Sequence, residues 1–572
     1  MAHLTGDQLP AARPHRPWVG LACAGAMVAA GWFACAPALR GDWVWDDTIE
    51  VVENPLLRDG PGLWNIWFNP HGLFDYYPVK SSVQWLQWQL WGTNPFGYHL
   101  TSLGLHLAGA LLFWRVLRKL GVRWAWLGGL LFAVHPLTVE SVAWVSELKN
   151  TLALPPLLAA FSCYLEYDAR QRTRDLVGAA LLFLIAMLCK TSAVMFPVTL
   201  LLYAWWKRGR IGLADWKASA PFFAISLVLG LVTVWFQHHR AFGTAAAELD
   251  ALGGVWSRLA VAGPALFFYF ARSVLPVNLA PIYPQWPVAP PTAVQFLPWA
   301  GLAVALLWCW RCRGTWGRHA LFGCGWFVLH LAPFLGFTTM ALHRFTWVSD
   351  HLVYVPLLGL VGLAAAAAGT AWGHNGPAPR CWAVGAALAL GAGLAWSSHL
   401  YAATFRNEET LWTCTVRRNP LAWYAHYNLG QVLFKQRRLH EAILHFRRAA
   451  EIRPNFADAQ CSLGIALLYA DRSAEAIQHL EAALRARPDL AEAHGALANV
   501  LAAGGRLDEA QAHYAAAARS KPTDADLQFN WGNALLQAGR SAEAADHLRE
   551  AVRLNPADAQ ARAALDEALR RR

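Results

Sequence analysis

Residues 423–456 read WYAHYNLGQVLFKQRRLHEAILHFRRAAEIRPNF, and this stretch determines the architecture of the second half of the chain. Its pattern returns every 34 residues. Gly430 recurs as Gly464 and Gly532, with Ala498 at the remaining position. Small residues at a fixed spacing allow two antiparallel helices to pack closely, so the period predicts stacked helical units. The same register is kept by prolines at the unit boundaries, namely Pro420, Pro454, Pro488, Pro522 and Pro556.

Two alanine positions repeat with the same period. This pattern, with Leu-Gly, two small positions and a closing proline, resembles the tetratricopeptide repeat. We expect four repeats over 423–558, preceded by a connecting helix over 401–422 and followed by a capping helix over 559–572. Such an α-solenoid forms a concave groove that binds a protein or peptide, and a spacer or oligomerisation arm is the alternative. The alanines are Ala442, Ala476, Ala510 and Ala544, then Ala449, Ala483, Ala517 and Ala551.

The first 400 residues have a different composition. They contain 28 of the 31 tryptophans, and 26 Lys and Arg residues against 17 Asp and Glu residues. The whole chain is 56% hydrophobic and 15% charged, whereas ordinary soluble domains are roughly 25% charged. This composition excludes a disordered chain and a simple soluble enzyme, and it favours a polytopic membrane domain. Membrane topology explains the basic excess, so we expect no nucleic-acid partner.

Apolar runs and cationic clusters predict the topology of this domain. We expect about eleven spans in an all-α domain over 1–400, with an uncleaved first span at about 17–39 and a large external loop at 40–97. The run at 259–275 is predicted not to cross, because counting it as a span would put the basic cluster at 311–318 outside. The N-terminus is then cytoplasmic and the repeats are extracytoplasmic. Repeats rich in Ala and Arg suit a GC-rich genome, so we expect a bacterial inner membrane.

Candidate chemical groups lie at the predicted membrane edge. Asp46 and Asp47 follow the first span, and adjacent carboxylates could act as a general base or hold a divalent metal. An N-cap or a solvated acidic patch is the alternative. His135 and Glu140 follow the third span, where polar groups are costly unless they are used, and ordinary loop chemistry is the alternative. Lys190 lies between two apolar runs, where it either snorkels or binds phosphate.

A third group borders the apolar run at 352–371. Arg344 is close enough in sequence to pair with Asp350, and His351 follows directly. This pair is either a structural ion pair or part of a site for an anionic ligand. The chain carries no nucleotide-binding loop and no HExxH or GxSxG motif, so a cytosolic nucleotide-using enzyme is not expected.

The ordered combination of these motifs resembles the transmembrane and tetratricopeptide-repeat-containing O-mannosyltransferases and their bacterial relatives, in the GT-C class of polytopic glycosyltransferases. The resemblance covers almost the whole chain. It rests on motifs that each carry little weight alone: Val44-Trp-Asp46-Asp47, Asn54-Pro55, Trp91-Gly-Thr-Asn94-Pro95, His99-Leu-Thr, His106, His135-Pro136, Glu140-Ser-Val-Ala-Trp144, Lys190, Pro276-Val-Asn278, Pro281-Ile-Tyr283-Pro284, Asp350 and Tyr354-Val-Pro356.

The resemblance implies an enzyme with a polyprenyl- or dolichyl-phosphate sugar as donor. It implies transfer of a mannose-like sugar, with inversion, to a hydroxyl of an extracytoplasmic protein that the repeats hold. The family's acidic pair corresponds to Asp46 and Asp47, one of which would be the base. Lys190, Arg344 and His351 would lie near the donor phosphate. His135, Glu140 and Asp350 would complete the site.

Three positions depart from the pattern of the family. The chain has Lys80 after Tyr76-Tyr77 where Arg-Pro is expected, Thr191 after Lys190 where Glu or Pro is expected, and His351 where Arg is expected. The change at 351 removes a permanent charge near the expected phosphate. The alternative to an enzyme is a non-catalytic membrane-anchored scaffold, in which the repeats recruit other proteins.

Overall fold

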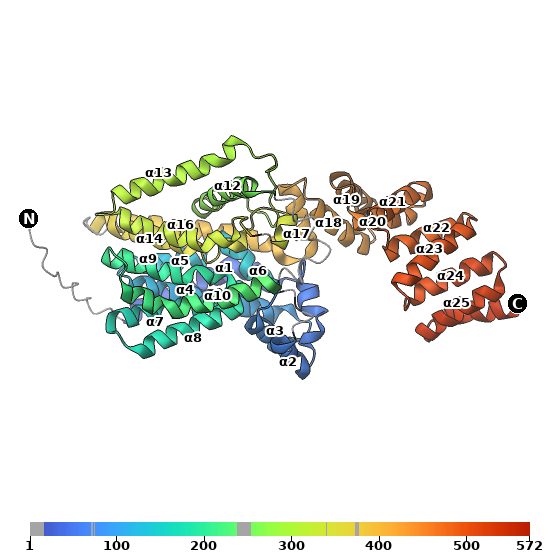
Figure 1. Ribbon diagram of the computed structural model, residues 1–572, viewed down its shortest axis with the longest axis horizontal. Helices are drawn as coiled ribbons and strands as arrows, with labels where there is room; N and C mark the ends of the chain where they lie inside the picture. Colours follow the sequence, from blue (N-terminus) through green and yellow to red (C-terminus); the bar gives the residue numbers. More distant parts are fainter. Residues whose placement is uncertain are drawn as a thin grey trace, which may run out of the picture. The chain divides into compact units, whose positions relative to one another are not determined.

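A computed structural model describes residues 17–69, 73, 75–236, 253–338, 340–371 and 377–571. It divides into two units, Met1–Cys414 and Thr415–Arg572. All regular elements in the described residues are helical, as Figure 1 shows, so the predicted all-α class is confirmed. Each unit has its own helical architecture.

The first unit is a bundle of long apolar helices. α4 packs against α5 and α7, α7 packs against α8, α14 packs against α15, and α1 packs against α16. The main helices are α1 (Pro17–Cys35), α4 (Pro95–Lys119), α5 (Ala125–Ala133), α7 (Leu148–Arg170), α8 (Thr173–Cys189), α9 (Phe196–Arg208), α10 (Leu213–Phe236), α12 (Val255–Val274), α13 (Leu297–Arg311), α14 (Gly317–Leu331), α15 (Leu357–Ala371) and α16 (Pro377–Ala402).

Several of these helices expose apolar side chains. α13 has no buried residue, and α10 exposes Leu227, Leu231 and Trp235. A soluble protein rarely exposes such a continuous apolar surface, whereas a lipid bilayer covers it without cost. The chain is therefore a membrane protein, as predicted.

Five helical segments in the described residues are long and apolar enough to cross a bilayer, and a sixth is added if a pair bent by 57° forms one span. About eleven spans were predicted. The difference arises because several apolar runs form short helices; α8 has 17 residues and is roughly 25 Å long, less than the roughly 30 Å hydrocarbon core. The run at 259–275 lies in α12, which is not among these segments. They are Trp18–Arg40, Pro95–Lys119, Leu213–Phe236, Ala293–Arg311 and Trp382–Arg406, with the bent pair Ala125–Val134 and Pro136–Ala143.

The large loop after α1 is itself folded. It contains α2 (Gly60–Phe68) and α3 (Pro78–Trp91), which pack against each other. Val51, Leu57 and Ile66 form a small core there with Tyr98 of α4 and Val145. This core holds the loop against the segment that follows α5 and thereby positions the carboxylates at the start of the loop.

The second unit is a series of antiparallel helix pairs, followed by a final helix (Figure 1). This confirms the predicted repeats. The pairs are α18 (Trp423–Lys435) with α19 (Leu439–Ile452), α20 (Ala457–Leu468) with α21 (Ser473–Ala486), α22 (Ala491–Ala503) with α23 (Leu507–Ser520), and α24 (Ala525–Gln537) with α25 (Ser541–Leu554); α26 (Ala559–Arg570) is last, and α17 (Glu408–Arg418) precedes α18.

The repeated position of the glycines in these units has a steric cause. A Cβ atom added at Gly464 would lie 2.7 Å from Cγ of Leu480, which is fully buried. We expect Gly464→Ala to destabilise the chain by about 1–3 kcal/mol through overpacking. Gly495 is the matched control, because its added Cβ would meet only Leu527 at 3.6 Å. Thermal unfolding followed by circular dichroism should show a lower Tm for Gly464→Ala and an equal or higher Tm for Gly495→Ala.

Candidate active site

Aromatic contacts of Trp45 stabilise the turn that follows α1. Trp45 has a positive φ of 57°, an uncommon conformation for a residue other than glycine. Its ring stacks on Trp144 with the centroids 4.7 Å apart and meets Trp412 edge-on at 5.2 Å. The turn therefore presents the two following carboxylates, Asp46 and Asp47, to the segment 144–147.

Asp47 is completely buried and accepts three hydrogen bonds. Its Oδ1 accepts from the backbone N–H of Ser146 at 2.8 Å and from Oγ of Ser146 at 2.7 Å, and its Oδ2 accepts from the N–H of Val44 at 3.1 Å. Burial raises the pKa of Asp47 to about 7, although these hydrogen bonds oppose the rise. Asp47 therefore ties two distant loops together, and its oxygens are already engaged.

We expect Asp47→Asn to reduce stability by about 1–3 kcal/mol, because the amide N–H₂ would face backbone donors. The Tm of the detergent-solubilised chain measures this loss. Ser146→Ala, which removes only the hydroxyl donor, should cost less than Asp47→Asn. An unchanged Tm for Asp47→Asn would contradict the structural role of this carboxylate.

Asp46 has a different environment. Its side chain is only half-buried, yet Oδ1 is buried and accepts no hydrogen bond from the described residues. Burial is the largest cause that raises the pKa of Asp46 well above its usual value, and the charges of Glu50 and Asp47 add to it. The charge of Lys149 opposes the rise. An unengaged carboxylate oxygen with a raised pKa is suited to accept a proton.

Glu147 is the centre of a buried ionic cluster. Its carboxylate lies 3.0 Å from Nζ of Lys149, 3.4 Å from Nζ of Lys190 and 3.8 Å from Nε2 of His351. Asn150 donates from Nδ2 to Glu147 at 2.6 Å and accepts from Lys190 at Oδ1 at 2.8 Å. Two lysines and a histidine thus share one carboxylate in a place from which solvent is largely excluded.

The charged groups in this cluster shift the pKa values of their neighbours. Burial alone would raise the pKa of Glu147, but His351, Lys149 and Lys190 outweigh it and hold the pKa well below its usual range. Burial lowers the pKa of Lys190, an effect that Glu147 partly offsets. Burial also opposes protonation of Lys149, but the charges of Glu147 and Glu50 keep its pKa above the usual value.

His351 also binds a second carboxylate. Its Nδ1 lies 2.9 Å from Oε1 of Glu140, to which Oγ of Ser349 donates at 3.1 Å. Since Nε2 faces Glu147, the imidazole ring connects Glu140 with the lysine cluster. The histidine that replaces the expected arginine thus still occupies a position between two acids.

A further buried ion pair lies in the folded loop. Lys80 of α3 donates to Glu50 at 2.6 Å, and both side chains are about one-tenth exposed. Glu50 in turn acts electrostatically on Asp46 and Lys149. Lys80 therefore supplies a buried cation at the position where the resemblance led us to expect an arginine.

The other predicted residues lie around this cluster in different roles. Asp350 accepts hydrogen bonds from Tyr283 at 2.9 Å and Tyr401 at 3.1 Å, so tyrosine hydroxyls occupy the place expected for Arg344. Arg344 lies over the ring of Phe345, 5.7 Å from its centroid. His135 accepts from the N–H of Leu137 and donates to the carbonyl of Ser273 at 3.1 Å, so both of its nitrogens hold the backbone.

The structure brings Glu140, Lys190 and His351 together around Glu147. Asp47 binds the neighbouring Ser146, and Asp46 interacts electrostatically with Lys149 and Glu147. Sequence reasoning did not assign roles to Glu147, Lys149, Asn150, Glu50 or Lys80. Glu147 and Lys149 were recognisable as polar groups that share the predicted external loop with Glu140, but their spacing gave them no specific role. In the part of the chain that is described, no group of three or more His, Cys, Asp and Glu side chains could hold a metal ion.

Two parts of the chain match models of known protein families. Residues 75–237 match the family model for dolichyl-phosphate-mannose-protein mannosyltransferases. Residues 423–456, 461–525 and 496–559 match tetratricopeptide-repeat models. The first match covers Lys80, Glu140, Glu147, Lys149 and Lys190. The predicted resemblance is therefore confirmed.

Curated relatives are similar in sequence to part of this chain. Protein O-mannosyl-transferase TMTC1 of Mus musculus is 32% identical over 174 residues, which cover 28% of this chain and 18% of that protein. Protein O-mannosyl-transferase F38B6.6 of Caenorhabditis elegans is 30% identical over 138 residues, which cover 21% of this chain and 20% of that protein. The chain thus spans about a fifth of the length of these relatives. The solved tetratricopeptide-repeat protein YrrB is 24% identical to the part of the chain that it matches. The match covers 28% of this chain and 81% of the YrrB chain, with a TM-score of 0.26.

Proposed function

We propose that this chain transfers a mannose-like sugar from a polyprenyl- or dolichyl-phosphate donor to a hydroxyl of an extracytoplasmic protein, with inversion at the sugar carbon. The observation that carries this proposal is that Asp46, whose Oδ1 accepts no hydrogen bond from the described residues, interacts electrostatically with the cluster formed by Glu147, Lys149, Lys190 and His351. A base and a set of cations are the two kinds of group that such a displacement needs.

In the proposed reaction, Asp46 accepts the proton of the acceptor hydroxyl. The acceptor oxygen forms a bond to the sugar carbon while the bond from that carbon to the phosphate oxygen breaks. The electron pair leaves with the lipid phosphate, whose negative charge Lys190, Lys149 and His351 stabilise. Asp47 is a positioning residue that holds the turn, and Glu147 keeps the cations together in the absence of the donor.

Access to the cations requires movement. Lys190 and His351 line a narrow crevice with Asn150 and His330, and this crevice leaves no water-sized space. The donor phosphate therefore reaches Lys190 when the crevice widens. The donor phosphodiester carries one negative charge, as Glu147 does, so it can replace Glu147 as the partner of the two lysines. The second negative charge that develops on the phosphate as the sugar departs then strengthens its pairing with these lysines.

The repeats would present the acceptor. Within the second unit, a hollow of about 270 Å³ is lined by Tyr427, Phe434, Phe446 and Ile465, together with Asp458 and Glu492. Aromatic and aliphatic side chains with a few acidic groups suit an extended polypeptide. We place the Asp46 network and the repeats on the extracytoplasmic side, with the N-terminus in the cytoplasm, in a bacterial inner membrane.

Product analysis tests the proposal. The full chain is incubated with polyprenyl-phosphate mannose and envelope proteins, and the linkage and anomeric configuration of the product are determined by NMR. We expect mannose on a Ser or Thr hydroxyl with a configuration opposite to that of the donor. A product that retains the donor configuration would contradict the single displacement. Capture of envelope proteins without any transfer would favour the scaffold.

A further inference from the structure

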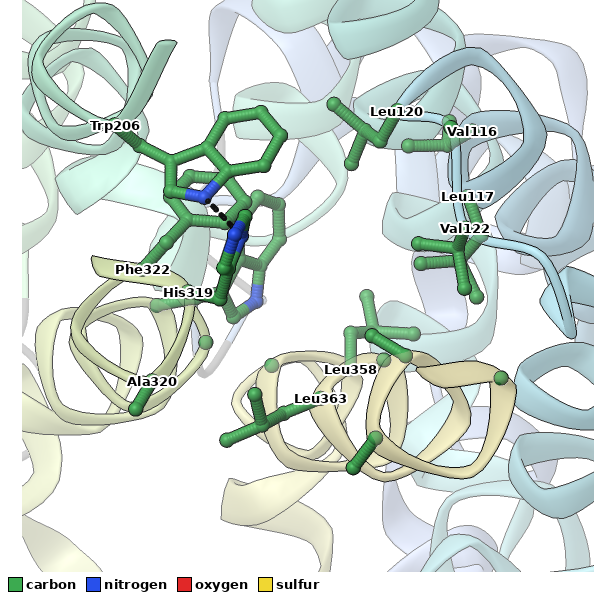
Figure 2. A pocket seen from close by; sticks show the side chains of 18 of the residues that line it. Val116, Leu117, Leu120, Val122, Trp206, His319, Ala320, Phe322, Leu358 and Leu363 are labelled. Atoms are coloured by element: carbon green, nitrogen blue, oxygen red, sulfur yellow. Dashed lines mark hydrogen bonds between the residues drawn. The ribbon is translucent and has the colours of Figure 1, made fainter. Parts of the chain in front are cut away.

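A second cavity lies in the first unit among α4, α7, α9, α14 and α15 (Figure 2). Its volume is about 590 Å³, which falls within the range of roughly 300–1,000 Å³ typical of ligand pockets. Figure 2 shows Val116, Leu117 and Leu120 on one side, Phe322 and His319 on another, and Leu358 and Leu363 below them. The lining is predominantly apolar.

Small residues create this space. A Cβ atom added at Gly359 would lie 2.3 Å from the carbonyl oxygen of Gly323, so α14 and α15 touch through their backbones. Beyond this contact, α15 presents Gly362, Ala366 and Ala367 to the cavity. The lining of α15 runs from Leu358 to Thr370, which corresponds to roughly 18 Å along the helix. The cavity is therefore long enough for a hydrocarbon chain.

The inner end of the cavity is closed. Trp326 is buried, and its Nε1 donates to the carbonyl of Val355 at 3.1 Å. Its ring contacts the ring of His330, with the centroids 4.7 Å apart. Val355 and His330 line the crevice that contains Lys190, so Trp326 separates the apolar cavity from the candidate active site.

The other end of the cavity is polar and cationic. Arg123, Trp316 and Thr370 contribute exposed side chains to the lining there. Trp206 donates from Nε1 to Nδ1 of His319 at 3.0 Å, as the dashed line in Figure 2 marks. An apolar interior with one cationic, tryptophan-bearing end has the polarity of an amphiphile at a membrane surface.

We propose that this cavity binds an acyl chain of an anionic phospholipid, with the lipid phosphate at Arg123. An unfilled apolar cavity of this size forfeits dispersion contacts, and its walls offer few partners for water, so a hydrocarbon chain is the favoured occupant. The positive charge of Arg123 selects a negative headgroup. This site is distinct from the proposed donor site, from which Trp326 separates it, and it does not depend on the proposed activity.

Photolabelling tests the proposal. The full chain is reconstituted in vesicles that contain phosphatidylglycerol with a diazirine in one acyl chain, and labelled residues are mapped by mass spectrometry. We expect labelling within 113–123, 316–326 and 358–370. Ala366→Phe and the smaller change Ala367→Leu fill the cavity and should remove most of this labelling. Ala364→Phe, an exposed position of the same helix outside the lining, should leave it unchanged.

A protein variant tests whether the charge of Arg123 selects the lipid headgroup. Arg123→Gln should reduce the preference for phosphatidylglycerol over phosphatidylcholine about fivefold. Arg313→Gln, at an exposed position outside the lining, should not change it. Equal labelling of the Ala366→Phe and Ala364→Phe variants would overturn the proposal, as would equal labelling by the two lipids. Displacement of the label by equimolar polyprenyl phosphate would assign the cavity to the donor chain instead and would also overturn it.

Discussion

Asp46→Asn is expected to lower the rate of sugar transfer by about 10²–10⁴-fold, because a general base contributes a factor of this size. The amide cannot accept the proton of the acceptor hydroxyl at neutral pH. No described residue donates a hydrogen bond to Oδ1 of Asp46. The same change should therefore alter the free energy of unfolding by no more than about 0.5 kcal/mol, and the Tm should stay nearly the same. The initial rate of mannose incorporation measures the effect.

The pH dependence provides an independent check of this role. Burial and the neighbouring Glu50 and Asp47 raise the pKa of Asp46, so the carboxylate is protonated at a higher pH than an ordinary aspartate. A base is active only when it is deprotonated. Activity should therefore fall as the pH is lowered through this raised pKa, and Asp46→Asn should lack this acid limb. Transfer at the wild-type rate in Asp46→Asn would show that another group is the base.

Glu147→Gln is expected to have the largest effect on stability, about 3–5 kcal/mol, because it removes a buried negative charge from Lys149, Lys190 and His351. The ammonium groups of Lys149 and Lys190 would then repel each other where water cannot screen them. Thermal unfolding in detergent should show a large decrease in Tm. The decrease should become smaller when Lys190 is also changed to Met, because one of the unpaired charges is removed.

Glu166→Gln is the matched control for this prediction. Glu166 pairs with Lys119 at 2.8 Å, but its side chain is 33% exposed. An ion pair near the surface contributes about 0–1 kcal/mol, so the control should lose little stability. Similar decreases in Tm for Glu147→Gln and Glu166→Gln would contradict the view that the cluster around Glu147 is a buried structural centre.

The repeat unit could be predicted from the sequence because its contacts are local. Gly464 meets Leu480 in the same repeat, and the 34-residue period displays this relation several times over. The apolar helices of the first unit were also predictable, because the composition of a short stretch of sequence identifies each of them. Their number was harder to predict, because a run such as α8 is apolar but forms a helix shorter than the bilayer.

The candidate site depends on contacts that sequence spacing does not reveal. Asp46 and Asp47 are adjacent and chemically identical, and the hydrogen bonds from Ser146, 99 positions away, and from Val44 distinguish the engaged carboxylate from the unengaged one. Arg344 and Asp350 are close in sequence, but Tyr283 and Tyr401 reach Asp350 from other segments. Pairing by sequence distance therefore fails where tertiary packing supplies a partner.

The central claim is that the network around Asp46 uses a lipid-phosphate sugar as its donor. The most direct test reconstitutes the full chain in vesicles with polyprenyl-phosphate mannose and measures the polyprenyl phosphate released and the mannose bound to protein in the same sample. We predict equal amounts of the two products, with neither formed unless acceptor protein is present. The absence of polyprenyl phosphate release from every polyprenyl-phosphate sugar offered, with envelope proteins still bound, would contradict the claim.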